Sequence, residues 1–267
     1  MMLVLNIAAN GMEARSKETA IIANNIANIS TDGYKSQQAT FSDLLYIKEQ
    51  RPGVQFNEEG NIIPTGIQIG LGTKLVGTYR LLNQGPPKQT NSQFDLSING
   101  NGYFRIEMPD GTFAYTRNGS LRLDSNGQLV TNDGLIVSPG IIIPQNYNAV
   151  DGGGVIINGS GQVFVKIDNE APQLIGQLDI ANFPNPGGLE TQGNNLLTVT
   201  ESSGNEILGT AGLDGMGFFQ QKWLEASNVN PITELVNLVT AQRAFEFSSK
   251  CFKAGDEMTQ TATTLKT

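Results

Sequence analysis

An apolar stripe with helical spacing opens the chain, and a second one closes it. The first stripe advances by three and four residues, the spacing that places side chains on one face of an α-helix. Its members are Leu5, Ala8, Met12, Arg15, Thr19, Ile22, Ile26 and Ile29. The stripe predicts a helix of roughly 25 residues, about 40 Å long. Gly33 marks its exit, because glycine readily adopts the positive φ found past a helix end.

The second stripe follows a helix start at Asn230, Pro231 and Glu234. Asn is a good N-cap, Pro suits the first helical position, and an acid in the first turn complements the helix dipole. The stripe and the apolar residues beside it are Ile232, Leu235, Val236, Leu238, Val239, Gln242, Phe245, Ser249 and Phe252. We therefore predict a second long helix at the end of the chain.

Three asparagines, Asn24, Asn25 and Asn28, crowd the last turns of the first predicted helix. Asn is a poor helix former, so this placement has a cause other than propensity. One interpretation is fraying toward a cap. The other is that the amides bond to backbone or to neighbouring helices and fix the packing register.

Between the helices, residues 74–217 predict a β-rich domain built from hairpins. Short alternating apolar runs are separated by Asn-Gly and Asp-Gly pairs, which favour the turns between antiparallel strands. These pairs begin at Asp110, Asn118, Asn126, Asp133 and Asn158. Strands do not alternate with helices as they do in nucleotide-binding α/β sheets.

An extended connector, residues 34–73, precedes this domain. Its central part is rich in Gly, Pro, Asn and Gln and holds few residues that could be buried, so it is either an ordered extension or a flexible loop. The connector residues that we single out are Gly53, Val54, Phe56, Ile62, Ile63 and Pro64.

Composition narrows the possible functions. The chain has 17 basic and 25 acidic residues, a net charge of -8, which disfavours binding to nucleic acid. It has no His and a single Cys, Cys251, which we expect to be a small buried apolar residue. The sequence shows neither a secretory signal peptide nor a run long enough to span a membrane. Acids such as Glu107, Asp110 and the pair Glu58-Glu59 are interpreted as solvated surface. We therefore expect no catalytic, cofactor or metal site.

The two terminal helices can lie side by side, because the first runs toward the β region and the second runs away from it. The fold class is mixed α and β, with an antiparallel, coiled-coil-like pair of helices flanking the β-rich domain. The expected parts are residues 1–33, 34–73, 74–217 and 218–267. Two helices have too little surface to bury both stripes against each other. Apolar faces that remain exposed to water favour association with other copies. A head-to-tail contact that does not close a ring repeats into a filament.

Three segments resemble signatures of one known family. They are IIANNIANISTDGYK at residues 21–35, INGNGYFRIEMPDGTFAYTRNGSLRLDSNGQLV at residues 98–130, and SNVNPITELVNLVTAQRAFE at residues 227–246. In this order they resemble the bacterial flagellar basal-body rod and hook proteins. The overall length and the connector at residues 48–69 look most like the distal rod members, in which this insertion is associated with a straight, stiff tube.

The resemblance implies a structural subunit that transmits torque from the motor to the hook, with its terminal helices forming the inner wall of a tubular polymer. It also implies type III export without a cleaved signal, and residence in the rod that crosses the periplasm. The implied partners are further copies, proximal rod proteins, the hook protein, the L and P ring proteins and the export apparatus. Nucleic acid and membrane insertion are not expected.

The alternatives within the family are a hook or a proximal rod protein. An alternative of another class is a secreted β-rich adhesin or carbohydrate-binding module. If the chain belongs to this family, we expect the amides of the three asparagines to set the packing in the polymer. The predicted packing residues are Leu5, Ala8, Met12, Ile22, Asn24, Asn25, Ile26, Asn28, Ile29, Ile232, Leu235, Leu238, Val239, Gln242, Phe245 and Phe252.

Overall fold

The computed structural model describes residues 2–50, 65–144, 154–166 and 171–265. The chain forms two compact units. The helical unit contains Met1–Ala27, Gln37–Tyr79 and Asn230–Thr267, and the β unit contains Asn28–Ser36 and Arg80–Val229. Among the described residues, no helix combines the length and the apolar character that a membrane span requires.

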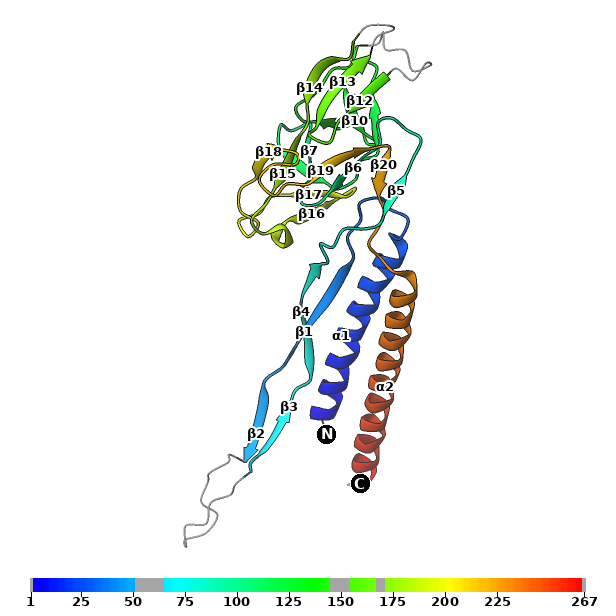
Figure 1. Ribbon diagram of the computed structural model, residues 1–267. Helices are drawn as coiled ribbons and strands as arrows, with labels where there is room; N and C mark the ends of the chain where they lie inside the picture. Colours follow the sequence, from blue (N-terminus) through cyan, green and yellow to red (C-terminus); the bar gives the residue numbers. More distant parts are fainter. Residues whose placement is uncertain (1, 51–64, 145–153, 167–170, 266–267) are drawn as a thin grey trace. The chain divides into compact units, whose positions relative to one another are not determined.

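Two long helices and a set of strands make up the helical unit (Figure 1). The helices are α1 (Met2–Ala27) and α2 (Pro231–Thr264), and the strands are β1 (Gln37–Asp43), β2 (Tyr46–Gln50), β3 (Ile67–Gly70) and β4 (Thr73–Arg80). β1 pairs with β4, and β2 pairs with β3 in antiparallel register. The predicted start of α2 is confirmed, because the side chain of Asn230 accepts hydrogen bonds from the backbone N–H groups of Ile232 and Thr233.

Close contacts join α1 and α2 at both ends. A Cβ atom added at Gly255, late in α2, would lie 3.2 Å from Leu5 Cδ2, early in α1. At the other end, Asn25 Nδ2 lies 3.4 Å from Glu234 Oε2. Between them, a Cβ atom at Gly11 would lie 3.2 Å from Ser248 Oγ. The small residues Gly11, Ser248 and Gly255 let the two helix backbones approach each other.

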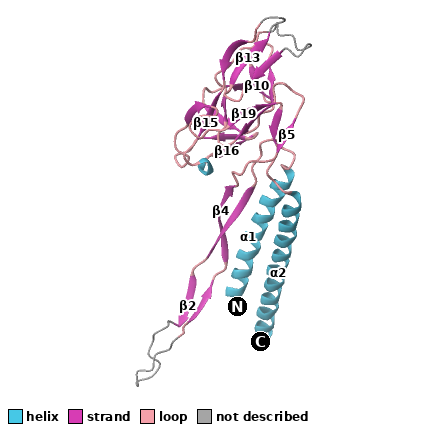
Figure 2. Ribbon diagram, in the orientation of Figure 1, coloured by secondary structure: helices cyan, strands magenta, loops and turns pink. Residues whose placement is uncertain are grey.

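The β unit is built almost entirely from short strands (Figure 2). Its largest sheet has the order β16-β17-β8-β7-β11-β10-β9. These strands are β16 (Glu190–Gly193), β17 (Leu196–Thr198), β8 (Phe113–Thr116), β7 (Phe104–Glu107), β11 (Ile136–Val137), β10 (Leu129–Thr131) and β9 (Leu121–Leu123). A three-stranded sheet consists of β12 (Gly154–Ile157), β13 (Gln162–Lys166) and β14 (Gln173–Gln177). Three two-stranded sheets complete the described part of the unit. They pair β15 (Asp179–Asn182) with β18 (Ile207–Thr210), β6 (Leu96–Asn99) with β19 (Phe218–Gln221), and β5 (Pro87–Gln89) with β20 (Trp223–Glu225). A short 3-10 helix, η1, spans Pro186–Gly188.

The core of the β unit is a continuous cluster of aliphatic side chains with Phe104 and Phe219. In β13, the buried residues Val163 and Val165 alternate with half-buried neighbours, so one face of this strand enters the core. A smaller cluster gathers Tyr103, Tyr115 and Phe183. The rings of Tyr115 and Phe183 meet edge to face with centroids 4.7 Å apart.

Most of the predicted hairpin turns are confirmed. The pairs at Asp110, Asn126, Asp133 and Asn158 lie between β7 and β8, β9 and β10, β10 and β11, and β12 and β13. The pair Asn118-Gly119 is the exception, because β8 and β9 do not pair with each other. Gly119 is required there for close packing: a Cβ atom would lie 1.6 Å from the carbonyl oxygen of Leu96.

Three predicted boundaries differ from the structure. Helix α1 ends at Ala27, and the residues up to Ser36 belong to the β unit. The described parts of the connector contain β1, β2 and β3, and β4 begins at its last residue, Thr73. Residues 218–225, assigned from sequence to the C-terminal helical part, form β19 and β20. Their ladder bonds to β6 and β5 explain the difference, since pairing with a distant strand is not visible in local periodicity.

Candidate assembly surface and the polar network of the β unit

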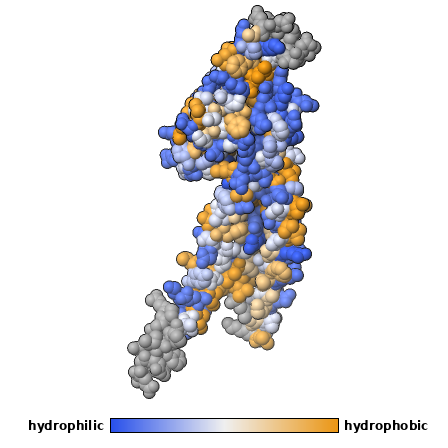
Figure 3. Space-filling view, in the orientation of Figure 1, coloured by the Kyte–Doolittle hydropathy of each residue, from blue (hydrophilic) through white to orange (hydrophobic). Residues whose placement is uncertain are grey.

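Large apolar side chains lie on the side of α2 that faces away from α1. We call this surface the outer face, defined by Ile232, Leu235, Val236, Val239 and Phe247. Ile232 is 73% exposed and Phe247 is 64% exposed. Figure 3 shows apolar residues gathered over α2. Burying one such side chain contributes roughly 1.5–3 kcal/mol, so the outer face is a strong candidate for contact with another protein surface.

The buried residues of α2 are small or polar: Glu234, Ala241 and Gly255. This buried face is rotated around the helix from the predicted stripe. Of the predicted packing residues of α2, only Leu238 is half-buried, and the exposed ones are Ile232, Leu235, Val239, Gln242, Phe245 and Phe252. These side chains are therefore available to another copy. Cys251 is exposed as well, and the expectation that it would be buried is wrong for the single chain.

The predicted packing residues of the first helix are less accessible. Ala8, Ile22 and Asn25 are buried within the helical unit. The half-buried residues are Leu5, Met12, Ile26, Asn28 and Ile29, and only Asn24 is exposed. Asn28 and Ile29 lie beyond the end of α1, in the β unit. Much of the apolar stripe of α1 is thus covered within the subunit.

Asn25 joins α1 to β1. Its side-chain Oδ1 accepts a hydrogen bond of 2.9 Å from the backbone N–H of Gln37, and its Nδ2 donates one of 2.8 Å to the carbonyl oxygen of the same residue. The amide therefore bonds to backbone inside the subunit. Asn28 lies in the turn after α1, where its Oδ1 and its carbonyl oxygen each accept a hydrogen bond of 3.2 Å from Thr31.

The strands of the helical unit and the link between β1 and β2 carry a second set of exposed apolar side chains. Leu45 is 82% exposed, and Tyr46, Ile47, Ile67 and Val76 are exposed to lesser degrees. These residues lie on either side of residues 53–64 of the sequence. The connector residues Gly53, Val54, Phe56, Ile62, Ile63 and Pro64 themselves lie outside the described residues.

A buried network of charges centres on Glu225 in the β unit. The side chain of Glu225 is 2% exposed and forms ion pairs with Lys35 and, at 3.4 Å, with Arg117 Nη1. It also accepts a hydrogen bond of 2.9 Å from the backbone N–H of Gly85. Burial lowers the pKa of Lys35 and that of Arg117, while the charge of Glu225 opposes both changes. One carboxylate therefore balances two buried cations.

The same network holds the segment that follows α1. The backbone N–H of Gly33 donates to the carbonyl oxygen of Glu225 at 2.7 Å. Gly33 has φ +73°, and a Cβ atom there would lie 2.7 Å from the backbone of Arg117. This glycine is needed for both its conformation and the close approach of two backbones. From the sequence, only the role of Gly33 after a helix was predicted.

Asn228 cross-links the segments of the β unit at which the chain passes to or from the helical unit. Its Nδ2 donates to the carbonyl oxygens of Leu81 and Asn83 at 2.8 and 3.1 Å. Its Oδ1 accepts from the backbone N–H of Ser36 at 2.7 Å. Sequence reasoning missed both this cross-link and the Glu225 network. The sequence offered one indication of these contacts. Lys35, Arg117 and Asn228 each lie in one of the three segments that resemble the family signatures.

The acids considered for catalysis do not assemble into a site in the described part of the chain. Asp110 accepts hydrogen bonds from the backbone and the hydroxyl of Thr112, which lower its pKa and complete a turn. Glu58 and Glu59 lie outside the described residues. A search of residues 2–50, 65–144, 154–166 and 171–265 finds no group of three or more His, Cys, Asp or Glu side chains that could hold a metal ion.

Three family models match the chain, and together they cover more than half of it. "Flagella basal body rod protein" matches residues 5–35, "Flagellar hook protein FlgE/F/G D1 domain" matches residues 97–165, and "Flagellar basal body rod FlgEFG protein C-terminal" matches residues 220–265. These ranges overlap the three segments that carried the resemblance.

Full-length relatives are also similar. The flagellar basal-body rod protein FlgG of Caulobacter vibrioides is 46% identical, over 99% of this chain and 100% of its own length. FlgG of Buchnera aphidicola subsp. Baizongia pistaciae is 42% identical, over 97% and 98%. FlgG of Borreliella burgdorferi is 42% identical, over 100% and 99%. With both ends, the β unit and the overall length matched, the chain belongs to the FlgG family of flagellar basal-body rod proteins.

Proposed function

We propose that this chain is the structural subunit of the distal rod and polymerises through α1 and α2 into a stiff tube that transmits torque from the motor to the hook. The observation that carries the proposal is the outer face of α2. A row of large apolar side chains is exposed there, although small residues mediate the contact of α2 with α1. Covering this row with neighbouring copies removes apolar surface from water.

The proposed polymer uses the two helices as an antiparallel, coiled-coil-like pair. Contacts of Leu5 with Gly255 and of Asn25 with Glu234 support this arrangement, because they match the start of one helix with the end of the other. The pair would line the inside of the tube, with the β unit outside it.

The role is mechanical and requires no catalytic group. We further propose export by the flagellar type III apparatus and residence in the part of the rod that crosses the periplasm. The proposed neighbours are further copies, the proximal rod proteins, the hook protein and the L and P ring proteins. Family membership supports this reading over that of an adhesin or carbohydrate-binding module.

The test is a full-length variant with Leu235→Gln and Val239→Gln, which makes two outer-face side chains polar. Both are exposed, so the subunit should still fold. We expect sedimentation and electron microscopy to show filaments for the wild-type chain and monomers for the variant. Leu174→Gln in β14, which is 56% exposed, is the matched control and should assemble normally. Filaments of the double variant at wild-type concentrations would refute the role of α2.

A further inference from the structure

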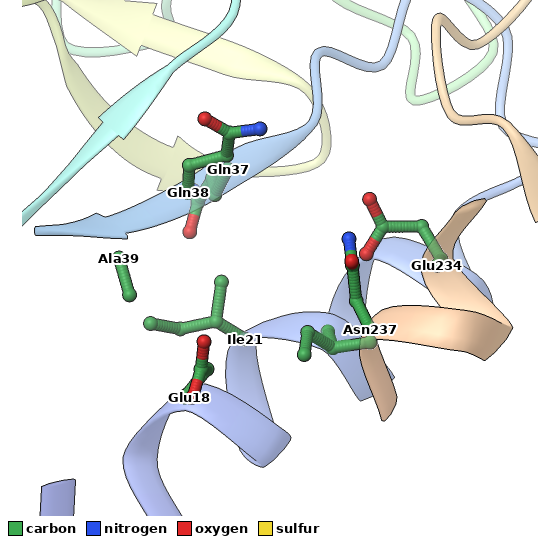
Figure 4. A pocket seen from close by; sticks show the side chains of 8 residues that line it. Glu18, Ile21, Gln37, Gln38, Ala39, Glu234 and Asn237 are labelled. Atoms are coloured by element: carbon green, nitrogen blue, oxygen red, sulfur yellow. The ribbon is translucent and has the colours of Figure 1, made fainter. Parts of the chain in front are cut away.

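A polar pocket of about 170 Å³ lies within the helical unit. Side chains from three elements surround it: Glu18 of α1, Gln37 and Gln38 of β1, and Glu234 and Asn237 of α2. Figure 4 shows the carboxylate of Glu234 turned toward this hollow. Glu18 already pairs with Arg15, with Nη1 2.7 Å from its Oε2.

Glu234 is a buried acid with a weak set of partners. It is 8% exposed, and its carboxylate accepts a hydrogen bond of 3.4 Å from the neutral amide of Asn25. In the described part of the chain, no Lys or Arg side chain forms an ion pair with it. The N-terminal end of α2 offsets part of the cost of this charge. A buried carboxylate is otherwise stabilised by a cation, and the described residues do not place one here.

Arg243 is a cation whose guanidinium has no acidic partner among the described residues. It is exposed on α2, and the described residues provide it with neither a hydrogen-bond acceptor nor a carboxylate. It follows Val239 and precedes Phe247, two members of the outer face. An assembly that covers these residues also takes the guanidinium out of water, which is costly unless a carboxylate meets it.

The two groups cannot meet within one chain. At 100° and 1.5 Å per residue, the nine residues from Glu234 to Arg243 place them on opposite sides of α2 and about 13 Å apart along it. A pair between them therefore joins two copies, with the outer face of one against the pocket side of the next. Such a contact is head to tail and can repeat without closing.

We propose that Arg243 of one copy enters the pocket of a second copy and pairs with its Glu234. This inference rests on the proposed polymerisation and names a specific contact within it. The planar guanidinium suits the pocket because it can donate to the carboxylate and to the amide oxygens of Gln37, Gln38 or Asn237 together. The ammonium of Lys250 is a poorer candidate, since it lies 5.6 Å from the ring centroid of Phe247 in its own subunit.

The test is a double-mutant cycle on assembly of the full-length chain. Arg243→Gln removes the cation, and Glu234→Gln removes the charge but keeps an oxygen that can accept from Asn25. We expect each change to raise the critical concentration for filaments about tenfold, equivalent to about 1.4 kcal/mol. The double variant should be no worse than either single one. Lys253→Gln makes the same charge change on the same helix and should stay within about twofold of wild type.

The possible results of this cycle distinguish failure of the proposed Arg243–Glu234 pair from failure of polymerisation itself. Multiplicative effects in the double variant, or normal assembly of Arg243→Gln, would overturn the pairing while leaving polymerisation through α2 intact. A wild-type chain that forms no filaments would overturn both. Thermal melting of each monomer checks folding, and Arg243→Gln should melt like wild type because Arg243 is exposed.

Discussion

Glu225 is the residue on which the buried charges of the β unit depend. It contacts Lys35, 190 positions away along the chain, and Arg117, 108 positions away. These distances explain why the network could not be predicted from the sequence: all three residues are visible, but nothing local says which cation a buried carboxylate will meet. The same limit applies to Asn25. Its odd position was visible, but its backbone partner Gln37 was not.

Glu225→Gln should destabilise the β unit. The change leaves Lys35 and Arg117 buried without their counter-charge, and breaking a buried ion pair typically costs about 3–5 kcal/mol. The measurement is denaturant unfolding of the monomeric chain at neutral pH. Glu190→Gln, at an exposed position in β16, is the control and should change stability by less than about 0.5 kcal/mol.

The loss of unfolding free energy caused by Glu225→Gln, relative to wild type, should become smaller at high pH. Burial lowers the pKa of Lys35 and the charge of Glu225 raises it, so this substitution lowers that pKa further. Between the folded and unfolded pKa values the unfolded state binds more protons, so the free energy of unfolding rises with pH. The recovery should therefore occur below the unfolded lysine pKa of about 10.4. A deficit that does not change up to that pH would assign the effect to Arg117 alone.

At the element scale, the type and approximate position of both long helices followed from their apolar spacing and from the Asn230 cap. The hairpins followed from Asn-Gly and Asp-Gly turns. The orientation of α2 could not be predicted in this way. Small residues such as Ala241 and Gly255 form its contact with α1, whereas the predicted stripe was defined by large apolar residues. The turn at Asn118 shows a related limit, since glycine there serves close packing against Leu96.

Asn25→Ala should weaken the attachment of β1 to α1. The change leaves the N–H and carbonyl groups of Gln37 without their side-chain partner in a partly buried place, which typically costs about 1–3 kcal/mol. Hydrogen exchange of the Gln37 amide should accelerate, and unfolding should shift to lower denaturant. Asn6→Ala, at an exposed position of the same helix, is the matched control. Equal behaviour of the two variants would contradict the bridging role of Asn25.

At the scale of the whole molecule, the order of the parts was predictable: a helix, an extended connector, a β-rich body and a final helix. The division into two units was not fully predictable. Segments 28–36 and 218–229 border the helices in sequence but belong to the β unit. Hydrogen bonds to Glu225 and Asn228 and the ladders of β19 and β20 determine that membership, and these are long-range contacts.

Deletion of residues 53–64 tests the proposed role of the connector. These residues lie outside the described part of the chain, so the expectation comes from the family resemblance. The shortened protein should fold and assemble, but its filaments should bend more than wild-type filaments in electron micrographs. Filaments with unchanged straightness would contradict the stiffening role.

We propose above that copies of this chain polymerise through their terminal helices. A reconstruction of assembled full-length protein by electron cryo-microscopy tests it most directly. We expect a tube whose inner wall consists of α1 and α2, with Ile232, Val236 and Phe247 covered by neighbouring copies. Filaments held together by β units alone, with the outer face of α2 left in solvent, would contradict it.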